Sequence, residues 1–335
     1  MSRAVVTGAT GLVGLHVVEA LQTAGIEVRA FARPSSDISR LAARPVEIVS
    51  GRLDDPAAAR RAIAGADWVI HAAGRLPLGR RRGLENRPGP YRIVNVEATE
   101  IWLCAALDAG VERFVYVSSA SVYSLDARAP IAECAPLGPP YEYGISKLAA
   151  EERVRRYQAQ GLPTTIIRPC VLYGTGDRYF LPIMLRLARL PLLPLVNGGH
   201  ALFDVAHALD VAELIYRACR VPSAAGAIYN AGPGEAMSLR DIFDTIRQVV
   251  GHGPRIVAVP AGVVEFLARL AHWPTALLFP SAESLVTPAG VADLSRDGHL
   301  DITRARQELG YAPRFKLAQG LAATLRPPHG MGPPH

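Results

Sequence analysis

The fold is decided close to the N-terminus, by the stretch Thr7-Gly8-Ala9-Thr10-Gly11-Leu12-Val13-Gly14. It follows an apolar β-type run, Ala4–Thr7, and opens an amphipathic helical pattern, Leu12–Ala24. Glycines allow a tight turn against a bound group, and the free N–H groups of the next helix favour an anion. The stretch therefore predicts a dinucleotide site. The expected contacts are Gly8, Thr10, Gly11, Leu12 and Val13.

Short β-rich runs alternate with helical patterns through the first two-thirds of the chain. The predicted strands are Ala4–Thr7, Glu27–Ala32, Val46–Val49, Trp68–His71, Phe114–Ser118 and Thr164–Arg168. This alternation is typical of an α/β fold with a Rossmann-like, doubly wound parallel sheet. We predict a dinucleotide-binding domain over residues 1–172, with a return segment at 203–230. Residues 173–202 and 231–325 are predicted to form a smaller substrate-binding region, and 326–335 a flexible tail.

Composition narrows the class of partner. The formal charge of +6 could indicate nucleic acid, but the basic residues are dispersed. The two clusters, Arg80–Arg82 and Arg153–Arg156, are expected to be solvated, the second on an outer helix face with Glu151 and Glu152. We therefore expect a small-molecule substrate and no nucleic acid.

Cysteine usage and hydropathy bear on the compartment. Four scattered cysteines indicate a reducing cytoplasm and predict neither a disulfide framework nor a metal site. The apolar stretches Leu181–Val196 and Ile256–Pro280 are interrupted by charges and prolines, so no membrane-spanning segment is expected. We predict a cytoplasmic protein.

The end of the second predicted strand discriminates between the two nicotinamide cofactors. An acidic residue there would bind the ribose 2′-hydroxyl, whereas an arginine suits a 2′-phosphate. The strand ends at Phe31-Ala32-Arg33, and the nearby Glu27 lies at its start. Arg33 therefore favours NADP(H), with NAD(H) as the alternative.

Tyr143-Gly144-Ile145-Ser146-Lys147 is the most informative segment for the chemistry. A separation of four places Tyr143 and Lys147 on one helix face, where an ammonium would lower the pKa of the phenol toward neutrality. The chain has 36 basic side chains, yet only Lys147 and Lys316 are lysines. Because a guanidinium does not replace an ammonium in this role, the pair predicts a proton-transfer site.

A serine cluster follows the fifth predicted strand, where ligands of doubly wound sheets bind. Ser119 is the predicted donor to a substrate oxygen on which negative charge develops, with Ser118 and Ser121 as supporting candidates. The alternative is that these serines only satisfy backbone groups at the end of the strand.

Together these segments resemble the extended short-chain dehydrogenase/reductase family, also called the NAD-dependent epimerase/dehydratase family. The resemblance covers nearly the whole chain and includes the glycine stretch, the serine, tyrosine and lysine, and several further positions: Asp54, His71-Ala72-Ala73, Asn95–Thr99, Arg168-Pro169 and Asp301–Pro313.

The resemblance implies further cofactor contacts. In relatives, the position of Asp54 contacts adenine, and the backbone at His71, Ala72 and Ala73 lies along the cofactor. The position of Asn95 orders the site near nicotinamide. Leu53 and Pro169 join the predicted cofactor-binding set by the same likeness. A homodimer through a helix pair is implied by analogy alone.

Two departures from the family pattern concern the substrate. Ala120-Ser121 stands where sugar-nucleotide dehydratases have Asp-Glu, and Phe203 stands where epimerases have a diphosphate-binding arginine. The chain therefore looks more like the branch with 3β-hydroxysteroid dehydrogenases and dihydroflavonol reductases. The apolar stretch Val257–Pro280 then fits a lipophilic substrate or contact with a membrane surface, or else an ordinary core helix.

The leading expectation is hydride transfer between the cofactor and a secondary alcohol or ketone, with Tyr143, Ser119 and Lys147 as the catalytic residues. A nucleotide-sugar epimerase with the same residues is the first alternative. A non-catalytic, cofactor-sensing regulatory protein is the second. Arg75 and Arg80–Arg82, after the fourth strand, could meet an acidic group on the substrate, but a solvated loop is the expected reading.

Overall fold

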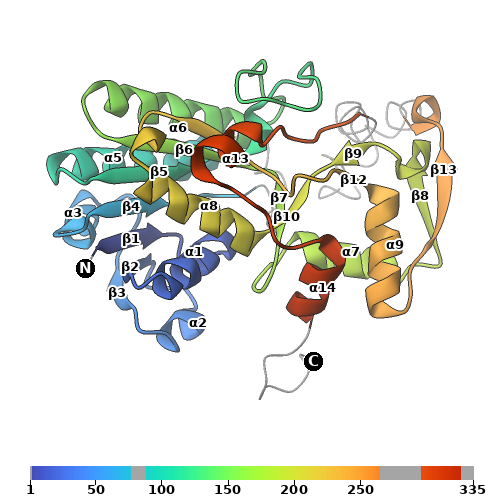
Figure 1. Cartoon of the computed structure of the whole chain (residues 1–335), viewed down its shortest axis with the longest axis horizontal. Coiled ribbons are helices and arrows are strands. Elements are labelled where there is room, and N and C mark those ends of the chain that lie inside the picture. The colour runs from blue at the N-terminus through green and yellow to red at the C-terminus, as the bar shows by residue number, and fades with distance from the viewer. Residues whose placement is uncertain (1, 77–87, 265–295, 326–335) are drawn as a thin grey trace.

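A seven-stranded parallel sheet forms the centre of the computed structural model, which describes residues 2–76, 88–264 and 296–325 (Figure 1). Its strand order is β11-β6-β5-β4-β1-β2-β3. The bounds are β1 Arg3–Thr7, β2 Glu27–Ala32, β3 Glu47–Ser50, β4 Trp68–His71, β5 Arg113–Val117, β6 Thr164–Pro169 and β11 Ile228–Ala231. The six predicted strands are confirmed to within one residue at each end. β11 comes from the end of the return segment, so the doubly wound sheet is confirmed.

Helices cover both faces of the sheet. On one face lie α1 (Leu12–Thr23), α8 (Ala208–Arg220) and α13 (Thr303–Leu309). On the other face lie α3 (Pro56–Ile63), α5 (Ala98–Asp108) and α6 (Glu142–Ala159). Strands covered on both sides are buried along their whole length, as in β4 and β5, whose residues are mostly apolar. Short elements join these layers: α2 Ser39–Ala42, α4 Pro88–Tyr91, the π-helix η1 Arg92–Glu97, and the 3₁₀ turns η2 Ala120–Val122 and η4 Pro222–Ala224.

A second group of elements lies beyond the carboxyl ends of the strands, on the right of Figure 1. It has its own apolar cluster, to which α7, β8 and α9 contribute Leu181, Leu193 and Phe243. α9 begins at Ser238 with a reciprocal capping box to Asp241. Its elements are β7 Val171–Tyr173, α7 Phe180–Ala188, β8 Leu192–Val196, η3 Asn197–Gly199, β9 Leu202–Phe203, β10 Val205–His207, β12 Met237–Ser238, α9 Leu239–Val250, β13 Arg255–Val259 and α14 Leu317–Leu325.

His207 and Asp210 connect the two groups of elements. The Nδ1 atom of His207 caps α8 by accepting from the backbone N–H of Leu209 at 3.2 Å. The carboxylate of Asp210 accepts from the N–H groups of Arg314 and Phe315, at 3.1 Å each. His207 and Asp210 thus have structural roles: the first caps α8, and the second ties Arg314 and Phe315 to it.

Some predictions fall on residues outside the described ranges. Arg80–Arg82 and the part of the apolar stretch from 265 to 280 are among them. Among the described helices, none has the length and apolar character needed to cross a membrane. The four cysteines are free thiols.

Candidate active site

The glycine stretch turns between β1 and α1 in the way the sequence predicts. Gly8 has φ +67°, and a Cβ placed on it would lie 2.7 Å from the backbone N of Ala73. A Cβ on Gly14 would lie 2.2 Å from the carbonyl O of Gly8. Gly11 is the N-cap of α1 and supplies no side-chain cap, which leaves N–H groups of the first turn for an anion. The turn therefore fits a dinucleotide pyrophosphate.

His71 is fully buried and connects the glycine turn to α5. Its Nδ1 lies 3.0 Å from the hydroxyl of Thr7, and its Nε2 lies 3.1 Å from that of Thr99. The Thr99 hydroxyl gives its proton to the carbonyl O of Asn95, so it must accept from Nε2–H of His71. Nδ1 then accepts from Thr7, whose hydroxyl in turn accepts from the N–H of Ala73 at 3.2 Å.

Burial lowers the pKa of His71 to about 3, with the charge of Lys147 acting in the same direction. The imidazole is therefore neutral. Through the Thr7 hydroxyl it helps to hold Ala73 in place beside Gly8.

Asn95 sits in the π-helix η1, a rare form that is frequent at functional sites. Its Oδ1 accepts from the N–H of Arg75 at 2.7 Å, and its Nδ2 donates to the hydroxyl of Ser146 at 2.9 Å. Ser146 donates to the carbonyl O of Tyr143 at 2.7 Å. Asn95 thus joins the loop after β4 to the start of α6. Arg75 contributes its backbone here, and its side chain is exposed.

Ser119, Tyr143 and Lys147 meet at the carboxyl end of β5. Ser119 caps the turn η2 and is hydrogen-bonded to the phenol of Tyr143. Lys147 is buried one helical turn beyond Tyr143, and its Nζ donates to the carbonyl O of Val117 at 2.7 Å. A Cβ on Gly74 would lie 3.4 Å from both Lys147 Nζ and Asn95 Oδ1, so these two groups flank the same small space.

The acid–base properties differ from the sequence prediction. Burial raises the pKa of Tyr143 to about 12, although the hydrogen bond from Ser119 lowers it. Burial lowers the pKa of Lys147 to about 8, opposed by the charge of Glu151. Desolvation of the phenolate thus outweighs the hydrogen bond from Ser119, so the pKa of Tyr143 lies above its ordinary value in this structure.

Glu151 lies one turn further along α6, and its environment also corrects a prediction. It is fully buried rather than on a solvated face. Its carboxylate accepts from Arg168 at 2.9 and 2.7 Å and from the Ser118 hydroxyl at 2.6 Å. Burial alone would lower the pKa of Arg168, but the contact with Glu151 raises it. Only Arg153, Arg155 and Arg156 form the predicted ion-paired outer surface, with Glu100 and Glu151 as partners.

The opposite arm of the predicted cofactor site is basic. Arg33 is exposed directly after β2. A small pocket beside Thr10 and Gly11 is lined by two further arginines, Arg40 from α2 and Arg178 from the loop after β7. The carboxylate of Asp54 faces Arg52 at 2.7 Å, which lowers its pKa. The adjacent Leu53 accepts from the indole of Trp102 through its carbonyl.

The substrate side of the site contains the two departures from the family pattern. Phe203 stands at the position where epimerases have a diphosphate-binding arginine, and it packs beside the apolar cluster around Tyr173 and Phe243. Ala120 and Ser121 belong to η2, and Pro169 ends β6 opposite Ala231. Within the described ranges, no group of His, Cys, Asp or Glu side chains is placed to hold a metal ion.

Sequence reasoning missed several residues of the site. Ser146 lies inside the Tyr-x-x-x-Lys segment and could have been suspected as a polar residue near a catalytic pair. Arg40 and Arg178 gave no such signal, because they are 138 positions apart and meet only through the fold.

The comparisons with known proteins agree with this geometry. The model of the NAD dependent epimerase/dehydratase family matches residues 4–232. The chain is 31% identical over 339 residues to 4-hydroxy-2-methyl-3-oxo-4-farnesyl-3,4-dihydroquinoline-1-oxide ketoreductase of Stigmatella aurantiaca, which covers 98% of each chain. It is 30% identical over 323 residues to ceramide reductase of Caulobacter vibrioides, covering 96% of this chain and 92% of that one.

A solved structure is also similar over most of the chain. MoeE5 in complex with UDP-glucuronic acid and NAD is 26% identical, with a TM-score of 0.72. The match covers 96% of this chain and 97% of MoeE5. The protein therefore belongs to the NAD-dependent epimerase/dehydratase family and is an NAD-binding oxidoreductase of the extended short-chain dehydrogenase/reductase type.

Proposed function

We propose that this enzyme reduces a ketone to a secondary alcohol on a lipophilic substrate, with NADP(H) as the preferred cofactor. The observation that carries the proposal is the convergence of Ser119, Tyr143 and Lys147 at the carboxyl end of β5. The buried ammonium of Lys147 lies one turn away. A substrate-binding region at residues 173–202 and 231–325 would cover this edge of the sheet.

Each catalytic residue has one role in the proposed reaction. A reduced nicotinamide held in this site would supply the hydride. Ser119 donates a hydrogen bond to the substrate oxygen, and the Tyr143 hydroxyl gives that oxygen a proton. With a pKa of about 12, Tyr143 is fully protonated at neutral pH, so it is ready to act as an acid. We favour the reductive direction because two relatives are named as reductases. Lys147, charged below its pKa of about 8, holds the end of β5 and adds positive charge to the site.

Three features support a lipophilic substrate and NADP(H). Phe203 replaces the guanidinium that would bind a nucleotide diphosphate, and a lost bidentate contact of that kind is costly. Two relatives are named as reductases of a farnesylated quinoline oxide and of ceramide. Arg33, exposed directly after β2, supplies positive charge where a 2′-phosphate is expected. The predicted contacts of Asp54, Asn95 and Pro169 with the cofactor remain part of the proposal.

Epimerisation of a nucleotide sugar is the second candidate, because MoeE5 holds UDP-glucuronic acid on a similar fold. The absorbance of the reduced nicotinamide during turnover distinguishes ketone reduction from epimerisation. The enzyme should be screened with sterol, terpenoid, long-chain keto and nucleotide-sugar substrates, with NADPH and NADH compared. Net oxidation of NADPH with a lipophilic ketone supports reduction. Interconversion of nucleotide sugars without net absorbance change would contradict it.

The cofactor preference can be tested separately with Arg33→Ala. Losing a charge-assisted hydrogen bond should raise the KM for NADPH by about tenfold or more and leave the KM for NADH unchanged. Arg61→Ala, on the exposed surface of α3, is the matched control. Equal effects on both cofactors would remove Arg33 from the 2′-phosphate site.

A further inference from the structure

A two-stranded parallel ribbon, β8 with β13, forms one edge of the molecule on the right of Figure 1. Its register pairs Leu192 with Arg255, Leu193 with Ile256 and Pro194 with Val257. Paired residues of parallel strands share a face. Leu193 and Ile256 face inward and join the apolar cluster with α7 and α9.

The other face of the ribbon, formed by Leu192, Pro194 and Val257, is open, and we call it the outer face. Leu192 is 54% exposed and Val257 43% exposed. Parallel sheets are almost always covered on both faces. A parallel ribbon with an exposed apolar face therefore indicates a surface that is covered when the protein is at work.

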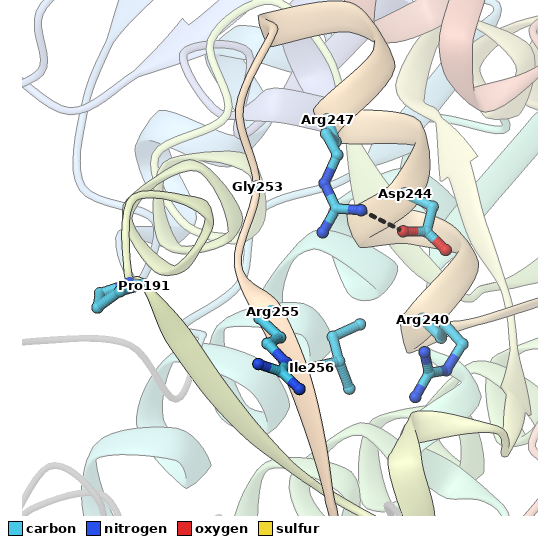
Figure 2. Close-up of a pocket in the computed structure, with 7 residues that line it drawn as sticks. All are labelled: Pro191, Arg240, Asp244, Arg247, Gly253, Arg255 and Ile256. Carbon is cyan, nitrogen blue, oxygen red and sulfur yellow. Dashed lines mark hydrogen bonds and ion pairs between the residues drawn. The ribbon is translucent and has the colours of Figure 1, made fainter.

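A hollow of about 410 Å³ borders the outer face, between β13 and α9. Figure 2 shows Arg240, Asp244 and Arg247 on α9 beside Arg255 and Ile256 on β13. We call this the arginine hollow. Three guanidinium groups and one carboxylate line it, which leaves a net charge of +2 by count.

Backbone contacts orient two of these guanidinium groups. Arg240 donates to the carbonyl O of Gly198 at 3.2 Å, and Arg247 donates to that of Pro254 at 2.5 Å. Arg247 also lies 3.4 Å from Asp244. Among the described residues, none forms an ion pair or hydrogen bond with the exposed guanidinium of Arg255, so it is available to an outside anion.

We propose that the outer face and the arginine hollow together dock on the surface of an anionic phospholipid bilayer. An apolar face bordered by arginines is the pattern of proteins that lie in the membrane interface, where arginines meet phosphate groups. A second copy of the chain is the competing occupant, and its binding would give a dimer without vesicle binding.

The test measures co-sedimentation of the full-length enzyme with vesicles. Phosphatidylcholine vesicles containing about one-third phosphatidylglycerol should bind the protein, and pure phosphatidylcholine vesicles should not. Binding should weaken as salt is added, because exposed charges are screened. Inorganic phosphate at the same total phosphate concentration should not displace the protein, since the apolar contact belongs to the bilayer.

Two double variants separate the components. Arg247→Gln/Arg255→Gln should lower the partition coefficient about 30-fold, from about fivefold for each basic residue. Leu192→Ser/Val257→Ser should also release the protein. Arg60→Gln/Arg61→Gln, which removes the same charge from α3 at the other end of the molecule, should bind like the wild type.

Three results would overturn the proposal. One is equal sedimentation with the two vesicle types. Another is a loss of binding in the α3 control as large as in the hollow variant. The third is a dimer that Leu192→Ser/Val257→Ser dissociates in the absence of vesicle binding, because that would assign the face to a second copy. Turnover of a water-soluble test ketone should be unchanged in the variants, which keeps this test distinct from the proposed reaction.

Discussion

Glu151 shows how a single buried charge supports the site. It is fully buried, and Arg168 and the Ser118 hydroxyl occupy its carboxylate. Its charge also raises the pKa of Lys147 against the effect of burial. The carboxylate therefore acts on both the strand end that carries Ser119 and the helix that carries Tyr143.

Glu151→Gln tests this role. Removing one partner of a buried ion pair leaves Arg168 uncompensated and should cost about 3–5 kcal/mol of unfolding free energy. Urea denaturation measures the loss. Glu152→Gln, the next residue and exposed, is the control and should change stability by less than about 0.5 kcal/mol. Equal stability of the two variants would mean that the Glu151–Arg168 pair does not stabilise the fold.

At the scale of elements, the glycine turn depends on close backbone contact as well as on dihedral angle. Gly8 has φ +67° and lies against Ala72 and Ala73. Gly25, at the end of α1, has a similar φ of +74°, but a Cβ there would meet nothing within 4 Å. Substitution at Gly25 therefore tests backbone strain alone, whereas substitution at Gly8 adds a steric clash with neighbouring backbone.

Gly25→Ala should lose about 1–2 kcal/mol of stability from the left-handed backbone, and Gly8→Ala should lose more, because its methyl group also meets the backbone of Ala72 and Ala73. Only Gly8→Ala should also weaken NADPH binding, by at least about tenfold, because its methyl group pushes the turn away from the backbone of Ala72 and Ala73. Isothermal titration calorimetry measures the affinity. Unchanged NADPH affinity in Gly8→Ala would argue against the glycine turn as the pyrophosphate site.

Much of this level of structure follows from the sequence. The strands could be predicted because buried parallel strands are short apolar runs, and the glycine turn and Tyr143–Lys147 spacing are local patterns. Three features of the site could not be predicted from the sequence. The π-helix around Asn95 has no local signature. The burial of Glu151 depends on Arg168 from another strand. The pKa of Tyr143 depends on desolvation by the assembled fold.

For the whole molecule, Asp204 links the sheet to the second group of elements. It lies between β9 and β10 and is 4% exposed, and its carboxylate accepts from the N–H of Leu300 at 2.8 Å. Burial raises its pKa to about 6. A carboxyl whose pKa is raised on folding stabilises the fold least above that pKa, because the unfolded state then gives up its proton more readily.

Asp204→Asn should therefore stabilise the protein at pH 8 by up to about 3 kcal/mol, from two pKa units and the linkage relation. Near pH 4 the gain should disappear, because the native carboxyl is protonated there. An amide oxygen can still accept from Leu300. Thermal unfolding across this pH range measures the effect, with the exposed Asp126→Asn as control. A gain that does not depend on pH would contradict the raised pKa.

The central claim is that the Tyr143 hydroxyl donates the proton in ketone reduction. Tyr143→Phe removes that hydroxyl alone, and Tyr157→Phe, further along the same helix, is the matched control. With a ketone substrate from the screen, single-turnover NADPH oxidation should slow by about 10²–10⁴-fold in Tyr143→Phe, with NADPH affinity unchanged. Tyr157→Phe should react at the wild-type rate. A Tyr143→Phe enzyme that oxidises NADPH at near wild-type rate would contradict the account.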